Sequence, residues 1–149
     1  MTTTADTTTT LDDVKAFAAG LGPLAHLATV RSDGTPDVVP VHPAWEGDTL
    51  WAMVHEGTAK VRNIAGNPKV ALHWQVGDDG DGVELWGTAS VHTDLETKRR
   101  LWEGVFDYDL NEFAPGGPDA PGSAFIAVDP ARAVIIRQFG MQGIDRWRR

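Results

Sequence analysis

Short polar turns between apolar runs constrain the fold of this chain more than any other feature. Ser32-Asp33-Gly34 and Glu46-Gly47-Asp48 each separate two runs with the composition of strands, at the spacing of a hairpin. A parallel arrangement needs a crossover of about a dozen residues or more, which these turns cannot supply. The chain is therefore predicted to form a mostly antiparallel sheet.

Strand-like composition recurs along most of the chain, and helices are few and interspersed. The expected strands span residues 24–31, 36–45, 49–55, 69–76, 83–92, 124–128 and 133–139, with a turn at Asp129-Pro130 between the last two. This order predicts a mainly β fold, a β-barrel with a few helices, rather than a parallel α/β fold. The common nucleotide loops, G-x-G-x-x-G after the first strand and G-x-x-x-x-G-K-[ST], are absent from the sequence.

Capping residues and apolar spacing locate the first and third helices. The first spans residues 11–21, with Thr10 as its N-cap. The third opens at a capping box formed by residues 93–96 and runs through Phe106. The Thr-rich residues 1–9 are expected to be a flexible lead, which leaves residues 10–149 as a single domain.

A short basic helix between residues 58 and 68 carries the main functional signal. Thr58 is expected to be its N-cap, with the hydroxyl accepting from backbone N–H groups of the first turn, and Pro68 ends it. Lys60 and Arg62 then oppose the helix dipole, which favours negative charge at this end. A bound phosphate or carboxylate would relieve that mismatch. The alternative is an ordinary surface helix whose cations face water.

The charge and composition exclude several classes of function. The net charge of -8 repels nucleic-acid backbones, and the basic cluster outside the central helix is confined to the tail, so no nucleic-acid partner is expected. The chain has no Cys, which excludes disulfides, thiolate catalysis and Cys-ligated zinc. Any redox chemistry therefore needs a bound cofactor.

Neither a membrane segment nor a signal peptide is recognisable. No apolar run reaches the roughly 18 residues of a membrane span, and the N-terminal residues lack both a basic start and an apolar core. We expect a cytoplasmic protein with no membrane partner.

The polar residues that could bind a metal or form a catalytic pair have simpler explanations. The five His lie in or beside the expected strands without paired metal-ligand spacing, so no metal site is expected. Residues 77–82 are rich in Asp and Gly but lack the Glu that closes a calcium loop, which favours a turn. Asp107, Asp109 and Glu112 flank a helix end, where solvated carboxylates are common.

Four segments resemble the pyridoxamine 5'-phosphate oxidase-like split-barrel superfamily, whose members bind flavins and deazaflavins. They read H-L-A-T-V-R-S-D-G-T-P-D-V-V-P-V, D-T-L-W-A-M, T-A-K-V-R-N-I-A-G-N-P-K-V-A-L and V-E-L-W-G-T-A, and the resemblance covers about residues 24–139. Its most specific residues are Thr58, Lys60, Asn63, Asn67 and Pro68. The segment W-E-G-V-F-D-Y-D-L-N-E-F-A-P-G-G-P-D-A-P resembles the general stress protein branch, whereas R-N-I and the Arg/Trp-rich terminus resemble a deazaflavin branch.

The resemblance implies a split β-barrel, FMN-binding type, with the cofactor at a homodimer interface. Lys60, Thr58 and nearby backbone amides would hold the cofactor phosphate, with Asn63 in the same motif. Trp147 would reach the cofactor from the C-terminal region.

The same resemblance places the flavin ring along the strand that follows the first hairpin. The ring would lie against Val39, Pro40 and Val41, with Met53 and Val54 of the next strand nearby. The two histidines nearest the ring could each donate to a flavin carbonyl, although surface positions on strands would also explain them; they are His42 and His55.

Departures from the oxidase pattern bear on the cofactor. Val39 occupies the position of a phosphate-binding Arg in the true oxidases, and cations for a substrate phosphate are not recognisable, so pyridoxal phosphate synthesis is not expected. FMN is the expected cofactor, because residues 115–119 resemble a stress-protein loop over the site entrance. A deazaflavin coenzyme with a polyglutamate tail is the alternative, and it is favoured by the spread of Arg62, Arg146, Arg148 and Arg149.

The sequence therefore predicts an FMN-binding oxidoreductase that transfers hydride to an unidentified small-molecule substrate. No catalytic residue is assigned, since the cofactor ring carries the hydride. The alternatives are a deazaflavin-dependent reductase and a non-catalytic flavin-binding, storage or stress protein, which would share the same phosphate grip.

Overall fold

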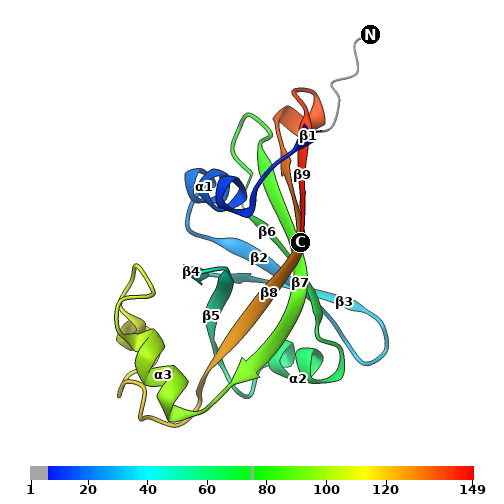
Figure 1. The fold of residues 1–149 in the computed structure, drawn as a ribbon. Coiled ribbons are helices and arrows are strands. Elements are labelled where there is room, and N and C mark those ends of the chain that lie inside the picture. Colours follow the sequence, from blue (N-terminus) through cyan, green and yellow to red (C-terminus); the bar gives the residue numbers. More distant parts are fainter. Residues whose placement is uncertain (1–6, 75) are drawn as a thin grey trace.

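The longest strand, β8 (Ser123–Ile136), is the branch point of a single curled sheet (Figure 1). In the computed structural model, which describes residues 7–74 and 76–149, β8 pairs along one side with β7 (Gly82–His92). Along its other side, the first half pairs with β5 (Thr49–His55) and the second half with β9 (Ile144–Arg148). This double pairing is what bends the sheet toward a barrel.

The remaining strands continue the sheet from β7 and from β5. Their order from β7 is β6 (Lys69–Trp74), β2 (Ala25–Val30) and β3 (Pro36–Val41), while β5 also pairs with β4 (Ala44–Glu46). All of these pairs are antiparallel. In the described residues, no pairing joins β3 to β5, so the barrel stays open between these two strands. The predicted mainly β split barrel is confirmed.

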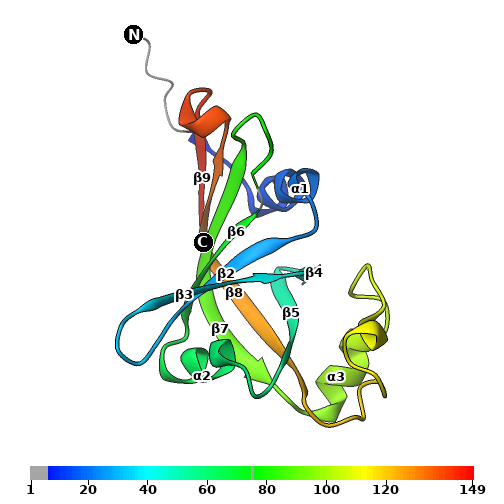
Figure 2. The same ribbon diagram turned by 180° about the vertical axis from the view of Figure 1, so that it is seen from behind.

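Three helices lie around the barrel in the part of the chain that the structure describes. α1 (Leu11–Leu21) and α2 (Ala59–Gly66) cover opposite ends, and α3 (Leu95–Trp102) lies beside β5 and β8 (Figures 1 and 2). The bounds and cap of α1 are as predicted, because the Thr10 hydroxyl accepts from the Asp13 N–H at 3.1 Å. The apolar face of this helix then packs on the barrel, burying Leu11, Val14 and Ala18.

Three helix ends differ from the sequence prediction. The Thr58 hydroxyl does not cap α2 but donates to the His55 carbonyl at 2.8 Å. Asp94, not Thr93, caps α3, since its carboxylate accepts from the Thr97 N–H at 3.0 Å. The same helix ends at Trp102 rather than Phe106, because Gly104 takes a positive φ of 86° that a helix cannot continue.

The strand boundaries differ from the predicted ones where a proline or pairing with a distant strand determines them. The expected strand 36–45 is broken into β3 and β4 at His42-Pro43, where Pro43 has no N–H for a ladder. The turn expected at Asp129-Pro130 is wrong, because β8 runs through both residues. Residues 1–6 of the expected lead, and Gln75 of the expected strand 69–76, lie outside the described residues.

The N-terminal and C-terminal segments also form strands that the sequence pattern did not indicate. Thr7 and Thr8 form β1 (Thr7–Thr8), which pairs in parallel with β9, and β9 in turn pairs with β8. The hydrogen bond from the Thr9 N–H to the Arg146 carbonyl extends the contact at 3.0 Å. Part of the expected lead and most of the expected tail are thus held on the sheet.

The apolar side chains form two cores on the two faces of the β5–β8 pair. The larger core fills the barrel, and its fully enclosed members include Leu27, Leu85, Ile126 and Ile135. The smaller core lies outside the barrel, between β5, β8 and the segment that begins with α3; its buried members are Trp51, Leu101, Phe106, Leu110, Phe125 and Ala127. Alternation along β8 supplies both, since Phe125 and Ile126 face opposite sides.

Replacing Gly87 by alanine is expected to lower the free energy of unfolding by about 1 to 3 kcal/mol. β7 and β8 shift register at this residue, and an added Cβ would lie 2.4 Å from the Asp129 carbonyl oxygen. Urea unfolding measures the change. The control is Gly20→Ala in α1, where nothing lies within 4 Å of the added Cβ, so a gain of about 0.4 to 1 kcal/mol is expected. Equal stability of both variants would contradict the close approach at Gly87.

Asp145→Asn is expected to destabilise the protein at neutral pH and to have little effect in acid. The Thr7 hydroxyl and the Arg137 guanidinium, the latter at 2.7 Å, hold the pKa of the Asp145 carboxyl below its ordinary value of 3.8. A depressed pKa stabilises the fold above pH 3.8, and this contribution is lost as the pH falls through the folded-state pKa. Unfolding curves across this range should therefore converge for the two proteins. A difference that persists in acid would contradict the assignment.

Candidate functional site

A cavity of about 560 Å³ lies in the split between β3 and β5. Its walls come from these two strands, the start of α2, and the segment after α3; they are formed by Leu24, Pro40, Val41, His42, Met53, Val54, His55, Thr58, Lys60, Tyr108 and Phe113. Most of these side chains are apolar, and one cation stands among them. Such a composition and volume are typical of a small-molecule or cofactor site.

Most of the residues that the sequence predicted for a cofactor site line this cavity together. They are Pro40, Val41, Met53, Val54, Thr58 and Lys60. β3 and β5 face each other across the split, so residues that are distant along the chain meet here. The cavity therefore joins the predicted ring-binding strands to the predicted phosphate-binding helix.

Val39, Asn63 and Trp147 do not line the cavity. Val39 alternates with Pro40 along β3 and packs against the barrel core. Asn63 turns to the sheet, where its side-chain amide donates to the Thr29 hydroxyl at 3.0 Å and so fastens α2 to β2. Trp147 lies on β9 beside a separate cavity of about 50 Å³. A role for these residues at the cofactor stays a prediction.

Lys60 is an uncompensated cation at the start of α2. The first turn of α2 has no acidic residue, and among residues 7–74 and 76–149 Lys60 has no hydrogen-bond or ion-pair partner. The backbone N–H groups of this turn also lack intrahelical partners, as at every helix start. The Arg62 guanidinium turns away to the Gly57 carbonyl at 2.8 Å. Lys60 and the free N–H groups thus place positive charge at one end of a mostly apolar cavity.

The His55 ring lies between the cavity in the split and a neighbouring cavity, with Nε2 beside Gly122 in the wall of the latter. The Gly57 N–H donates to Nδ1 of His55 at 3.2 Å, so the neutral ring carries its hydrogen on Nε2. This neighbouring cavity has a volume of about 270 Å³ and is lined by the Pro/Gly-rich loop of residues 114–122.

A second polar group is built from His42, Asp107 and Tyr108. Nε2 of His42 donates to the Asp107 carboxylate at 2.9 Å, and Tyr108 stacks on the imidazole with 4.2 Å between ring centroids. Burial, together with the nearby charge of Asp107, raises the pKa of the Tyr108 phenol. Tyr108 therefore stays a neutral donor at pH 7. Asp107 is an exposed carboxylate, as expected, and in addition it accepts a hydrogen bond from His42.

Sequence reasoning did not find the two aromatic residues that the segment after α3 contributes to the cavity wall. Tyr108 and Phe113 line the cavity, and Phe113 is 70% exposed. The available signal was a cluster of aromatic residues directly before the Pro/Gly-rich loop. No local periodicity indicates that this segment folds back over β5, because the packing of Phe106 on Phe125 decides it.

The arginines expected to hold an anionic tail are divided between two parts of the fold. Arg62 is on α2, whereas Arg146 and Arg148 are on β9 at the far end of the sheet (Figure 1). The Arg149 guanidinium is already bound by the Asp129 carboxylate at 2.5 Å and by the Pro130 carbonyl at 2.9 Å. Within one protomer, these side chains do not form a single basic surface.

The described residues hold neither a metal-binding cluster nor a membrane-spanning helix. No group of three or more His, Cys, Asp or Glu side chains in residues 7–74 and 76–149 is placed to hold a metal ion. None of the helices in that part of the chain has both the length and the apolar character needed to cross a membrane.

Comparison with known proteins identifies the family. A family model for pyridoxamine 5'-phosphate oxidase matches residues 12–136, whereas no curated protein matches the chain. Among solved structures, General Stress Protein 26 from Bacillus anthracis str. Sterne is 23% identical, with a TM-score of 0.68 over 84% of this chain and 92% of that one. An F420 reductase is 31% identical, with a TM-score of 0.57 over 74% of this chain and 87% of that one. An FMN-binding protein related to pyridoxamine 5'-phosphate oxidase, from Nostoc punctiforme PCC 73102, is 17% identical, with a TM-score of 0.68 over 91% and 86%. The family model spans most of the chain, and the protein belongs to the pyridoxamine 5'-phosphate oxidase family.

Proposed function

We propose that this protein binds FMN in the cavity between β3 and β5 and acts as an oxidoreductase on a small molecule. The observation that carries this proposal is the pairing of an apolar cavity of about 560 Å³ with Lys60, a cation that has no acidic partner in the described residues. FMN is an aromatic ring system with a phosphate at one end. Its apolar ring would match the apolar part of the cavity, and its anionic phosphate would match the cation. The chemistry of the cavity therefore fits the cofactor.

Each part of the cavity would hold a different part of the cofactor. Lys60 and the backbone N–H groups at the start of α2 would bind the phosphate. Pro40, Val41 and Met53 would contact the ring. The Thr58 hydroxyl uses its hydrogen on the His55 carbonyl, so in this arrangement it has no hydrogen to donate to a phosphate. Phosphate binding in this proposal therefore depends on Lys60 more than the sequence motif alone suggests.

Bound flavin would supply the hydride-transfer chemistry, and the protein would position the ring and exclude water. Tyr108 lines the cavity, and its phenol could donate a hydrogen bond to a ring carbonyl. Phe113 covers one side of the cavity, and the Pro/Gly-rich loop that follows it lines the neighbouring cavity of about 270 Å³. We assign no catalytic acid or base among these residues.

A second copy of the chain would complete the site. β3 ends the sheet, and its outward face carries Val38, which is 58% exposed, next to Pro40 of the cavity wall. Leu24 and Phe113 expose further apolar surface on the cavity rim. Apolar surface at the mouth of a cavity is typical of an interface, so we propose a homodimer that buries this face. Light scattering across a dilution series tests it, and a monomer with full cofactor affinity would contradict it.

A deazaflavin coenzyme is the second candidate for the cavity. It is supported by the 31% identity to an F420 reductase, the highest identity among the relatives described above. Support from the arginines is weaker than the sequence suggested, because Arg149 is bound to Asp129 and the others lie in two separate places. We therefore favour FMN.

Parallel titrations of the apo-protein with FMN and the deazaflavin coenzyme, at low and high salt, decide between the cofactors. Tighter binding of FMN supports the proposal, and a much tighter binding of the deazaflavin overturns it. Steady-state turnover with a reduced nicotinamide or reduced deazaflavin and a panel of acceptors then tests catalysis. Tight binding without turnover would favour a non-catalytic flavin-binding protein.

A further inference from the structure

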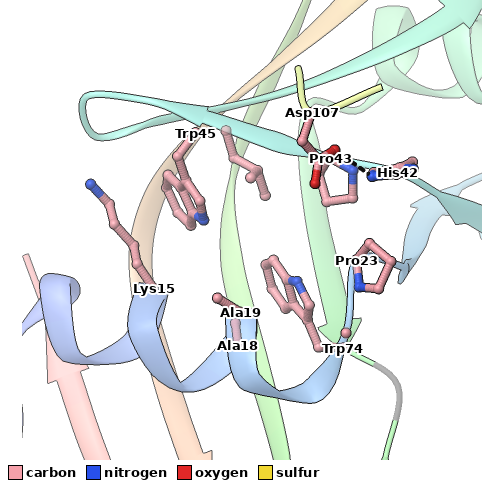
Figure 3. Close-up of a pocket in the computed structure, with 11 residues that line it drawn as sticks. Lys15, Ala18, Ala19, Pro23, His42, Pro43, Trp45, Trp74 and Asp107 are labelled. Carbon is pink, nitrogen blue, oxygen red and sulfur yellow. Dashed lines mark hydrogen bonds and ion pairs between the residues drawn. The ribbon is translucent and has the colours of Figure 1, made fainter. Parts of the chain in front are cut away.

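A second cavity, of about 380 Å³, lies between α1 and β4 (Figure 3). The rings of Trp45 and Trp74 extend into it from different strands and form much of its wall. His42 lines both this cavity and the one between β3 and β5, so the two are neighbours. The indole walls make a flat apolar space that suits a planar aromatic molecule.

The charged groups in the wall of this cavity are already paired. Lys15 binds the Asp48 carboxylate at 2.9 Å and the Gly47 carbonyl at 2.5 Å, and its ammonium lies over the Trp45 ring. His42 binds the Asp107 carboxylate, as the dashed line in Figure 3 shows. A charged ligand would have to compete with these existing pairs for its own partner. The cavity therefore favours an uncharged ligand.

One polar group in the wall is left for a ligand. Trp74 is only 4% exposed, and its indole N–H has no hydrogen-bond partner among residues 7–74 and 76–149. Unlike the unpartnered N–H of Trp51, it is not fully enclosed by protein. A ligand oxygen in the cavity could therefore reach this N–H and accept a hydrogen bond from it.

We propose that this cavity binds a neutral planar aromatic molecule with an oxygen substituent, which accepts a hydrogen bond from the Trp74 N–H. The ligand would stack against Trp45 and lie next to His42. Because His42 also borders the cofactor cavity, this class of molecule is the substrate class that the site selects; that last step rests on the proposed function, whereas binding in the cavity does not.

Calorimetric titration of the apo-protein with three probes tests the ligand class. 2-Naphthol is uncharged at pH 7 and carries the required oxygen, naphthalene lacks the oxygen, and 2-naphthoate is anionic. We expect 2-naphthol to bind about threefold to tenfold more tightly than naphthalene, the value of one hydrogen bond, and the anion to bind more weakly than either. Trp74→Phe should remove the advantage of 2-naphthol. No binding of 2-naphthol, or preference for the anion, would overturn the proposal.

A cavity-filling variant with a matched control locates the binding. Ala19 lines the cavity from an exposed position on α1, so Ala19→Phe should fill it and weaken 2-naphthol binding more than tenfold. Ala16→Phe, exposed on the same helix and not in the cavity wall, should leave binding unchanged. Thermal unfolding of both variants checks that they fold. Equal binding by both would overturn the location.

Separate effects on the two ligands distinguish this site from the cofactor site. Ala19→Phe should leave FMN affinity unchanged, and Lys60→Ala should leave 2-naphthol affinity unchanged. If FMN fails to bind the wild-type protein but 2-naphthol still binds with the Ala19 dependence, the cavity stands and the proposed function fails. Loss of 2-naphthol binding in Lys60→Ala would place the probe in the cofactor cavity and overturn the inference.

Discussion

Replacing Lys60 by alanine is expected to weaken FMN binding by roughly tenfold to a hundredfold, because a charge-assisted contact to phosphate contributes about 1.5 to 3 kcal/mol. The fold should be unaffected, since Lys60 has no hydrogen-bond or ion-pair partner among the described residues. Its removal also relieves a cation at the positive end of the α2 dipole. Quenching of flavin fluorescence measures the dissociation constant, and thermal unfolding of the apo-protein measures stability.

Two further variants make the Lys60 result specific. Lys69→Ala removes a lysine at the exposed start of β6, outside the cavity wall, and should leave FMN binding unchanged. Lys60→Arg keeps the charge and should retain most of the affinity. High salt should reduce the difference between wild type and Lys60→Ala, because the contact is electrostatic and partly exposed. An unchanged dissociation constant in folded Lys60→Ala would remove this residue from the site.

Sequence patterns located the helices and strands whose bounds are determined by residues nearby in the chain. Thr10 and the apolar spacing that follows located α1, and β5 has the bounds expected for the strand after the turn at Gly47. The split-barrel class followed from the shortness of the turns together with the family resemblance. These features are decided within a few residues along the chain.

Features decided by distant partners were missed. β9 is held by hydrogen bonds to β8 and by the ion pair of Asp145 with Arg137, which no local pattern indicates. The continuity of β8 through Pro130 depends on the register shift opposite Gly87, where proline is tolerated in a sheet. The Thr58 hydroxyl bonds back to His55 because the preceding turn brings that carbonyl within reach.

The candidate site likewise has residues that could be located from the local sequence and residues that only distant contacts bring into place. The motif around Lys60 and the strands β3 and β5 were located from the sequence, since the family pattern is carried by contiguous residues. The wall supplied by Tyr108 and Phe113 was not, because it depends on how the segment after α3 folds over β5. The same packing positions Asp107 beside His42. A long-range apolar contact thus decides which polar groups reach the cavity.

The packing of the aromatic residues after β7 on Phe125 of β8 gives the largest stability effect that we expect. Phe125→Ala should lower the free energy of unfolding by about 3 to 5 kcal/mol, the cost of emptying a fully enclosed aromatic position. Phe125 is 0% exposed on β8 and contacts the Phe106 ring at 5.7 Å and the Trp102 ring at 6.0 Å between centroids. Urea unfolding at 25 °C measures the loss. Phe113→Ala is the control, since Phe113 is 70% exposed and its removal should change stability by no more than about 0.5 kcal/mol.

The two phenylalanine variants should also separate packing from ligand contact. Phe106 touches both Phe125 and Tyr108, so emptying the Phe125 position loosens the layer that holds Tyr108 in the cavity wall. We therefore expect Phe125→Ala to weaken FMN binding even at temperatures where it remains folded. Phe113→Ala removes a cavity wall directly and should weaken binding without the loss of stability. If Phe125→Ala cost less than about 1 kcal/mol, the outer core would not be the close-packed layer that places these residues over β5.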